Sequence, residues 1–192
     1  MKNTKSLDAD IIVIGGGAAG LMAAGRAGEV GARVLLLEKT DGCGKKIMVS
    51  GKTRCNLTNS AELKKFISMY GSNGRFLHSA FHRFFRPELL AFLESHGLET
   101  KVERGGRIFP VSDNAQDVVK VFNKYLTKGK VQVKLNTQVT SIATENETIF
   151  SVKTSSGNYR SPAVIIAAGG ASWPSTGSTG DGSKLSAMLG HS

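Results

Sequence analysis

The chain has 192 residues, of which 40% are hydrophobic, and its formal net charge is +10. This length favours one domain or slightly more, and the basic balance suits an anionic partner such as a phosphorylated cofactor, nucleic acid or an acidic substrate. Its two cysteines, Cys43 and Cys55, fit neither a disulfide scaffold nor a zinc site, and no apolar run approaches the roughly 20 residues of a membrane span. We therefore expect a cytoplasmic protein with reduced thiols and no metal.

The first forty residues predict a strand–helix–strand unit. Residues 10–14 form a β-branched run typical of a strand buried on both faces, and residues 33–37 form a second one. An Ala- and Leu-rich helix is predicted between them, over residues 18–30. Gly31 is placed to end this helix in a left-handed conformation.

The middle of the chain departs from a simple series of βα units. Residues 40–60 predict a long polar loop, and residues 61–100 predict short amphipathic helices. The aromatic stripe in this region, which includes Phe76, Phe81 and Phe84, is expected to be core. A further helix is predicted over residues 114–127, with Ser112 or Asp113 as its cap.

The hydrophobic pattern then changes to a period of two. Residues 131–135, 139–142 and 148–154 alternate, and residues 155–158 form a turn, which together predict a small antiparallel meander. Residues 163–167 predict another fully buried strand. The fold class is therefore α/β, with a Rossmann-like parallel central sheet, inserted helices and the antiparallel meander.

A glycine cluster follows the first strand and matches the pattern G-x-G-x-x-G at Gly15, Gly17 and Gly20. The first glycine permits a tight turn, the second lets a pyrophosphate approach the backbone, and the third lets the helix pack close to the strand. The helix that begins at Ala18 and Ala19 offers free N–H groups to phosphates. The position of the cluster between a buried strand and a helix predicts dinucleotide binding.

Glu38 ends the second strand, where an acidic side chain can accept hydrogen bonds from ribose hydroxyls. Its charge would repel a 2′-phosphate, which disfavours NADP as the ligand of this unit. FAD and NAD both remain compatible with the local spacing. The later order of elements, in which a βαβ unit is interrupted and then completed by residues 163–167, resembles the glutathione-reductase-like FAD superfamily.

Three segments narrow this resemblance. Residues 45–59 (KKIMVSGKTRCNLTN), 106–110 (GRIFP) and 167–182 (AAGGASWPSTGSTGDG) are similar, in that order, to motifs of a bacterial FAD-dependent oxidoreductase family that includes aminoacetone oxidases and bile-acid desaturase-like reductases. The similarity extends over nearly the whole chain. Two departures are visible: Lys52 and Thr53 stand where the family commonly has glycines, and Ala168 stands where it commonly has threonine.

The resemblance implies FAD as cofactor, with NAD(P)H as a candidate reductant, and hydride transfer between flavin and a small organic substrate. No catalytic residue can be assigned, and Cys55 is expected to be a small buried hydrophobe near the cofactor. The residues expected to bind the cofactor are Gly15, Gly17, Ala18, Ala19, Gly20, Glu38, Lys39, Lys46, Ser50, Gly51, Arg54, Cys55, Asn56, Val139, Ala168, Gly169, Gly170 and Asp181.

The family continues beyond the segments matched here. We therefore expect residues 1–192 to be the N-terminal portion of an FAD-binding domain, without the substrate domain and the C-terminal FAD-binding segment, and to hold FAD weakly or not at all. The expected partner is a small-molecule substrate, with no nucleic acid and no membrane, and the oligomeric state stays open. Two alternatives are an RNA-modifying or nucleic-acid-binding flavoprotein, suggested by the basic charge, and a catalytically inert FAD-domain fragment.

Overall fold

The structure, a computed structural model, describes residues 6–145 and 148–191. The chain divides into two compact units, the first formed by Met1–Lys46 with Phe122–Ser192 and the second by Ile47–Val121. The division falls inside two helices, α2 (Lys45–Val49) and α6 (Ala115–Lys128). Within the described ranges, no helix is long and apolar enough to cross a membrane.

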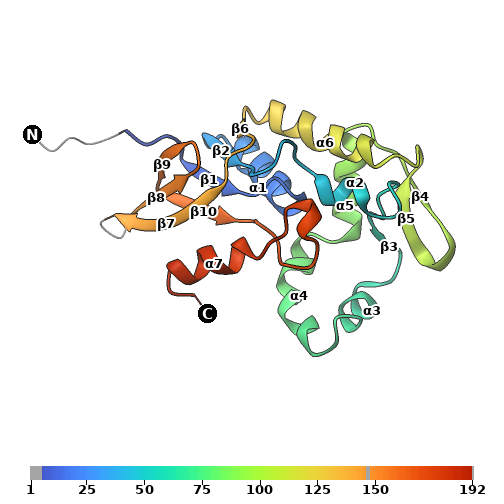
Figure 1. The fold of residues 1–192 in the computed structure, drawn as a ribbon. Coiled ribbons are helices and arrows are strands. Elements are labelled where there is room, and N and C mark those ends of the chain that lie inside the picture. The colour runs from blue at the N-terminus through green and yellow to red at the C-terminus, as the bar shows by residue number, and fades with distance from the viewer. Residues whose placement is uncertain (1–5, 146–147, 192) are drawn as a thin grey trace, which may run out of the picture. The chain divides into compact units, whose positions relative to one another are not determined.

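The first unit is built on a parallel four-stranded sheet in the order β10-β1-β2-β6 (Figure 1). The strands are β1 (Ile11–Ile14), β2 (Val34–Leu37), β6 (Gln132–Lys134) and β10 (Ala163–Ile166). Ile11 of the central strand lies opposite Val34 on one side and Ala163 on the other. The predicted α/β class with a Rossmann-like parallel sheet is therefore confirmed.

Both faces of the inner strands β1 and β2 are covered, as their uninterrupted apolar residues require. Helix α1 (Ala18–Glu29) contacts β1, β2 and β10. Alternate residues of β1 and β2 instead join a buried cluster with the antiparallel meander and α7 (Asp181–Met188). The buried residues of that cluster are Ala9, Ile12, Ile14, Leu35, Leu37, Val139, Ile142, Val152 and Leu185.

The meander contains three strands, β7 (Val139–Glu145), β8 (Ile149–Thr154) and β9 (Gly157–Ser161). The sequence prediction also placed residues 131–135 in it, and this was wrong, because β6 pairs in parallel with β2 in the main sheet. Residues of β10 are half-buried or exposed and not fully buried as predicted, because β10 is an edge strand of the sheet as described. Gly31 ends the α1 segment with a φ of 94°, as predicted.

The second unit combines a small antiparallel sheet, in the order β3-β5-β4, with three helices. Its strands are β3 (Thr58–Asn59), β4 (Thr100–Val102) and β5 (Arg107–Pro110), and its helices are α3 (Leu63–Ser68), α4 (Gly74–Arg83) and α5 (Arg86–Ser95). The predicted loop over residues 40–60 thus contains α2 and β3. Asn114 Oδ1 accepts from the N–H of Gln116 at the start of α6, at 2.9 Å, so Asn114 takes the capping place predicted for Ser112 or Asp113.

A cluster of four aromatic rings, with centroids 5.1–6.1 Å apart, joins α3 and α4 to the residues that follow each helix. These rings belong to Phe66, Tyr70, Phe81 and Phe85. Phe76 lies outside this cluster and is 88% exposed, and Phe84 is 41% exposed. The prediction that the whole stripe is core was therefore wrong. One residue step turns a helix by about 100°, so Leu77 and Phe76 cannot face the same neighbour.

Candidate nucleotide-binding site

The glycine turn lies at the carboxyl end of β1, the edge where ligands bind in open parallel sheets. Gly15 has a φ of 103°, and a Cβ there would lie 2.6 Å from the carbonyl oxygen of Ala167. A Cβ on Gly20 would collide with the carbonyl oxygen of Gly15. A Cβ on Gly17, in contrast, would meet nothing within 4 Å. Two glycines are thus required by packing, and the third borders open space.

Gly17 also caps helix α1 with an extended backbone and no side-chain cap hydrogen bond. The first turn of the helix contains no acidic residue. The first N–H groups of an α-helix lack intrahelical partners, and here they belong to Ala18, Ala19 and Gly20. The turn therefore presents backbone donors and the positive end of the helix dipole beside an uncovered glycine.

Glu38 ties the end of β2 to this turn. Its Oε2 accepts from the N–H of Gly16 at 2.6 Å, and its Oε1 accepts from the N–H and the hydroxyl of Thr40, both at 2.8 Å. The side chain is buried, with 9% exposure. A carboxylate offers about four lone-pair positions, so Oε2 retains room for one further donor. This remaining position is suited to the ribose hydroxyl that the sequence predicts for Glu38.

Two of the predicted lysines bind the loop that precedes α7. Lys39 Nζ lies 2.6 Å from both Thr179 Oγ1 and Asp181 Oδ2, and Lys46 Nζ donates to Ser178 Oγ at 2.8 Å. The hydrogen bond from Lys39 holds the pKa of Asp181 below its ordinary value. These contacts place Lys39, Lys46 and Asp181 in one cluster that fixes the loop to the end of β2.

The other predicted residues of the first unit lie nearby in the fold. Gly169, which follows β10 after Ala167 and Ala168, has a φ of 72°, and the carbonyl oxygen of Gly170 accepts a backbone hydrogen bond from Gly180 at 3.2 Å. Val139 begins β7, shortly after Thr137, whose N–H donates to the carbonyl oxygen of Glu38 at 2.8 Å. A cleft of about 410 Å³ opens beside α7, and its lining is Ile166, Ala168, Gly169, Gly182, Ser183, Ser186 and His191.

The remaining predicted residues form a tight turn in the second unit. Gly51, Lys52, Thr53 and Cys55 all have φ between 56° and 68°, which is the left-handed region. Cys55 is buried, with 5% exposure, and burial raises the pKa of its thiol. Lys52 and Thr53, where the resembling family commonly has glycines, thus adopt the backbone conformation that glycine favours.

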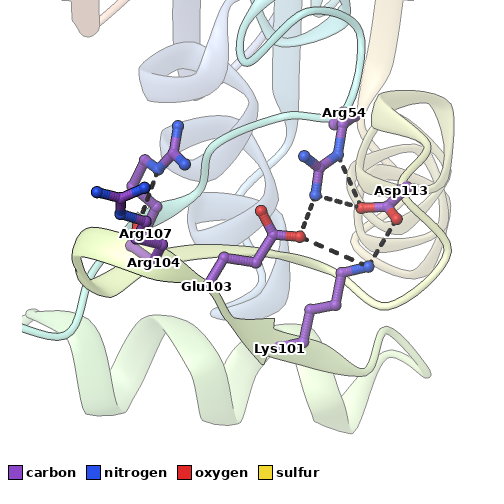
Figure 2. A network of polar contacts seen from close by, with 6 residues as sticks. All are labelled: Arg54, Lys101, Glu103, Arg104, Arg107 and Asp113. Carbon is purple, nitrogen blue, oxygen red and sulfur yellow. Dashed lines mark hydrogen bonds and ion pairs between the residues drawn. The ribbon is translucent and has the colours of Figure 1, made fainter.

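Arg54 lies in an ionic network of the second unit (Figure 2). Its guanidinium donates to Glu103 and to Asp113, with 2.8 Å between Nε and Asp113 Oδ1, and stacks 4.2 Å from the Phe109 ring centroid. Lys101 Nζ lies 2.6 Å from Asp113 and 3.8 Å from Glu103. Two cations therefore face two carboxylates, and the network joins the turn to β4 and β5.

The sequence analysis did not predict these contacts of Arg54 within the second unit. Its role at a cofactor stays a prediction, as do those of Ser50, Gly51, Cys55 and Asn56. Ser50 Oγ donates to the carbonyl oxygen of Ile47 at 2.8 Å, and Asn56 is exposed.

Sequence reasoning missed two residues beside the glycine turn. Thr40 donates two hydrogen bonds to the Glu38 carboxylate. Because threonine side chains often make local hydrogen bonds, a threonine two residues after Glu38 could have been predicted to do so. The Cys43 sulfur packs against Gly16, where a Cβ would come within 2.5 Å of it. Burial and the nearby Glu38 carboxylate raise the pKa of Cys43 to about 11, so its thiol is neutral at physiological pH.

The geometry of the first unit fits the ADP half of a dinucleotide. Backbone donors stand at an open glycine, a carboxylate with one free lone-pair position stands at the neighbouring strand end, and no 2′-phosphate could approach that carboxylate without repulsion. These features are the ones an FAD molecule needs for its pyrophosphate and its ribose.

The comparisons with known proteins agree with this geometry. The family model described as HI0933-like protein Rossmann domain matches residues 9–192. The chain is 35% identical over 181 residues to a 3-dehydro-bile acid delta(4,6)-reductase of Clostridium scindens, covering 93% of this chain and 43% of that protein. It is 34% identical over 182 residues to a ribosomal RNA dihydrouridine synthase of Escherichia coli, covering 94% and 44%. The chain thus spans less than half the length of these curated relatives.

Solved structures show the same fold. A flavocytochrome c3 fumarate reductase superposes with a TM-score of 0.63 at 21% identity, covering 87% of this chain and 34% of that one. A 3-ketosteroid-delta4-(5alpha)-dehydrogenase of Rhodococcus jostii superposes with a TM-score of 0.61 at 17% identity, covering 87% and 47%. The resemblance inferred from the three sequence segments is confirmed, and the chain belongs to the HI0933-like Rossmann-domain family.

Proposed function

We propose that this chain holds the ADP half of FAD within a flavoprotein oxidoreductase. The observation that carries the proposal is Gly17, the N-cap of α1. Its Cα borders open space, no side chain caps the helix, and the next residue toward the N-terminus is the Gly16 that Glu38 binds. The packing of the turn does not require a glycine here, and although a helix N-cap accepts glycine, Ser, Asp or Asn would cap α1 at least as well. Close approach of a pyrophosphate explains the glycine.

Each residue of the site has a defined task in this proposal. The N–H groups at the start of α1 bind the pyrophosphate, and Gly17 leaves the space for it. Oε2 of Glu38 accepts a hydrogen bond from a ribose hydroxyl while the same oxygen keeps the glycine turn in place through Gly16. The contacts of Lys39 and Lys46 hold the loop before α7 at the same sheet edge.

The names of the two curated relatives indicate one class of chemistry. One acts on delta(4,6) double bonds of a bile acid that is oxidised at position 3, and the other makes dihydrouridine in ribosomal RNA. In both substrates the reacting carbon–carbon double bond is conjugated with a carbonyl group. We therefore propose that the reaction of the whole protein is reduction of such a double bond.

FAD, when bound, supplies hydride transfer. The substrate then gains one hydride at the carbon β to its carbonyl and one proton at the α carbon, so two electrons and two hydrogens are added in total. NAD(P)H is the proposed source of the electrons. We assign no general acid to this reaction. We place the protein in the cytoplasm, where its free Cys43 and Cys55 would stay reduced.

Titration of FAD into the purified chain, followed by calorimetry, tests the proposal. Gly17→Ala should weaken FAD binding at least tenfold, because the new methyl group occupies the space of the pyrophosphate. Gly42→Ala is the matched control, since a Cβ there also meets nothing within 4 Å and the residue is outside the predicted site. Because binding by this chain alone is expected to be weak, the titration extends to millimolar FAD, and equal affinity of wild type and Gly17→Ala would refute the proposal.

A further inference from the structure

The segment between Glu62 and Glu88, which forms α3 and α4, contains no acidic residue. It does contain five Lys or Arg residues and two histidines, which are Lys64, Lys65, Arg75, Arg83, Arg86, His78 and His82. The aromatic cluster between the two helices makes this segment a packed hairpin, because Phe66 of α3 contacts both Phe81 and Phe85. Its cations are thus presented on a formed surface.

Four of these cations have no carboxylate partner among the described residues. Arg86 lies near Glu62 and donates to the carbonyl oxygen of Ala61. In the described part of the chain, no ion pair within 4 Å involves the remaining members, which are Lys64, Lys65, Arg75 and Arg83. All four are exposed. Arg54 and Lys101 of the same unit, in contrast, face two carboxylates (Figure 2). The hairpin therefore carries a concentrated, uncompensated positive charge.

Phe76 stands on the outer side of this hairpin, directly after Arg75. It is 88% exposed, whereas Phe81 of the same helix packs against Phe66 of α3. His78 and His82 stack on each other one helical turn apart, with ring centroids 5.8 Å apart, and both are exposed. Flat rings and cations together form the outer surface of α4.

We propose that this outer surface of α3 and α4 binds single-stranded RNA. Unpaired Lys and Arg side chains neutralise phosphates, and an exposed aromatic ring provides a face on which a base can stack. An anionic membrane would need a continuous apolar face on the helix, and the apolar face of α4 is turned toward α3. Contact with another protein segment would bury these four cations. The centres of protein interfaces are depleted of charged residues, so a protein partner fits this surface less well.

This inference deepens the proposed function, because it selects a uracil ring in RNA as the conjugated substrate and not a free small molecule. The sequence analysis expected no nucleic-acid partner, and it separately expected the aromatic stripe to be core, which the exposure of Phe76 contradicts. Only the choice of uracil as the reacting group rests on the proposed function; the RNA-binding surface does not. RNA binding requires no flavin and FAD binding requires no RNA, so the two can fail separately.

The test is fluorescence anisotropy of the purified chain with a labelled, uridine-rich 20-nucleotide RNA. Four phosphate contacts by Lys64, Lys65, Arg75 and Arg83 predict that affinity falls about 50-fold when salt rises from 50 to 200 mM, since each contact adds about 0.7 to the logarithmic slope for a single strand. In the double variant Arg75→Gln/Arg83→Gln the same salt step should cost only about sevenfold.

A matched control variant removes the same net charge elsewhere. Lys124→Gln/Lys128→Gln alters two exposed lysines of α6 that belong to the first unit, and it should keep the wild-type salt dependence. Phe76→Ala should weaken RNA binding at least about fivefold through lost stacking. Its melting temperature should not change, because the ring is exposed.

Three results would overturn the inference. The first is equal loss of RNA binding in the two double variants, which would indicate a general charge effect. The second is unchanged RNA affinity in Phe76→Ala. The third is binding to vesicles containing phosphatidylserine, weakened by Phe76→Ala, without binding to RNA, which would make the surface a membrane contact.

Discussion

Replacing Thr53 by glycine should stabilise the chain. Thr53 has a φ of 68°, and it is a β-branched residue for which the left-handed region is unfavourable. A left-handed residue with a Cβ costs about 1–2 kcal/mol, and the extra backbone entropy of glycine offsets roughly 0.5–1 kcal/mol of that gain. The expected increase in the free energy of unfolding is therefore about 0.5–1 kcal/mol. The backbone contact from Ala115 N–H to Thr53 O, at 2.9 Å, does not depend on the side chain.

Urea unfolding followed by far-UV circular dichroism measures this change. With a slope of about 2 kcal/mol per molar urea, the midpoint of Thr53→Gly should rise by about 0.25–0.5 M. Ala91→Gly, at an exposed position inside α5, is the control and should lower the midpoint by a similar amount, because glycine costs about 1 kcal/mol in a helix. A lowered midpoint for Thr53→Gly would show that the left-handed turn is not strained, and the reasoning would fail.

Two pH dependences follow from the contacts of the first unit. Burial and a hydrogen bond to Glu29 raise the pKa of Tyr125 to about 12, above its unfolded value, so the free energy of unfolding should decrease by at most about 3 kcal/mol as pH rises from 10 to 12. Urea titrations should show a smaller decrease in Tyr125→Phe, and an identical decrease would contradict the assignment. The hydrogen bond from Lys39 lowers the pKa of Asp181, so its contribution is complete above the unfolded value of 3.8 and is lost as pH falls through the lower folded value. Lys39→Met should flatten this acid limb in thermal melts, and a limb as steep as that of wild type would refute the pairing.

The local parts of the fold were readable from the sequence. Strand β1, the glycine turn and α1 form one continuous pattern, in which the change from β-branched residues to alanines marks each boundary. Strand β6 was misplaced because an edge strand of a parallel sheet also shows alternating residues, so Val133 gives no indication of whether its neighbour is β2 or β7. Pairing partners depend on the rest of the chain.

The backbone conformation of the glycine turn could be predicted from the sequence, whereas most of the side-chain contacts around the candidate site could not. A glycine is required where the local backbone has a positive φ or another backbone atom approaches closely. The roles of Gly15 and Gly20 could therefore be predicted from their own positions in the motif. The partners of Arg54, in contrast, lie 49 and 59 residues further along the chain, and no local pattern marks them. The outward position of Phe76 was equally hidden, because helical spacing identifies a face without telling which neighbour covers it.

The parallel sheet also sets an order of events during synthesis. Strand β1 can pair with β2 once both have left the ribosome, but its other neighbour, β10, follows about 150 residues later. At roughly 5–20 residues per second that interval lasts about 8–30 s. The second unit, Ile47–Val121, is continuous in sequence and emerges completely during this interval. The nascent first unit must therefore wait with one edge of its central strand unpaired while the inserted unit is already free to fold.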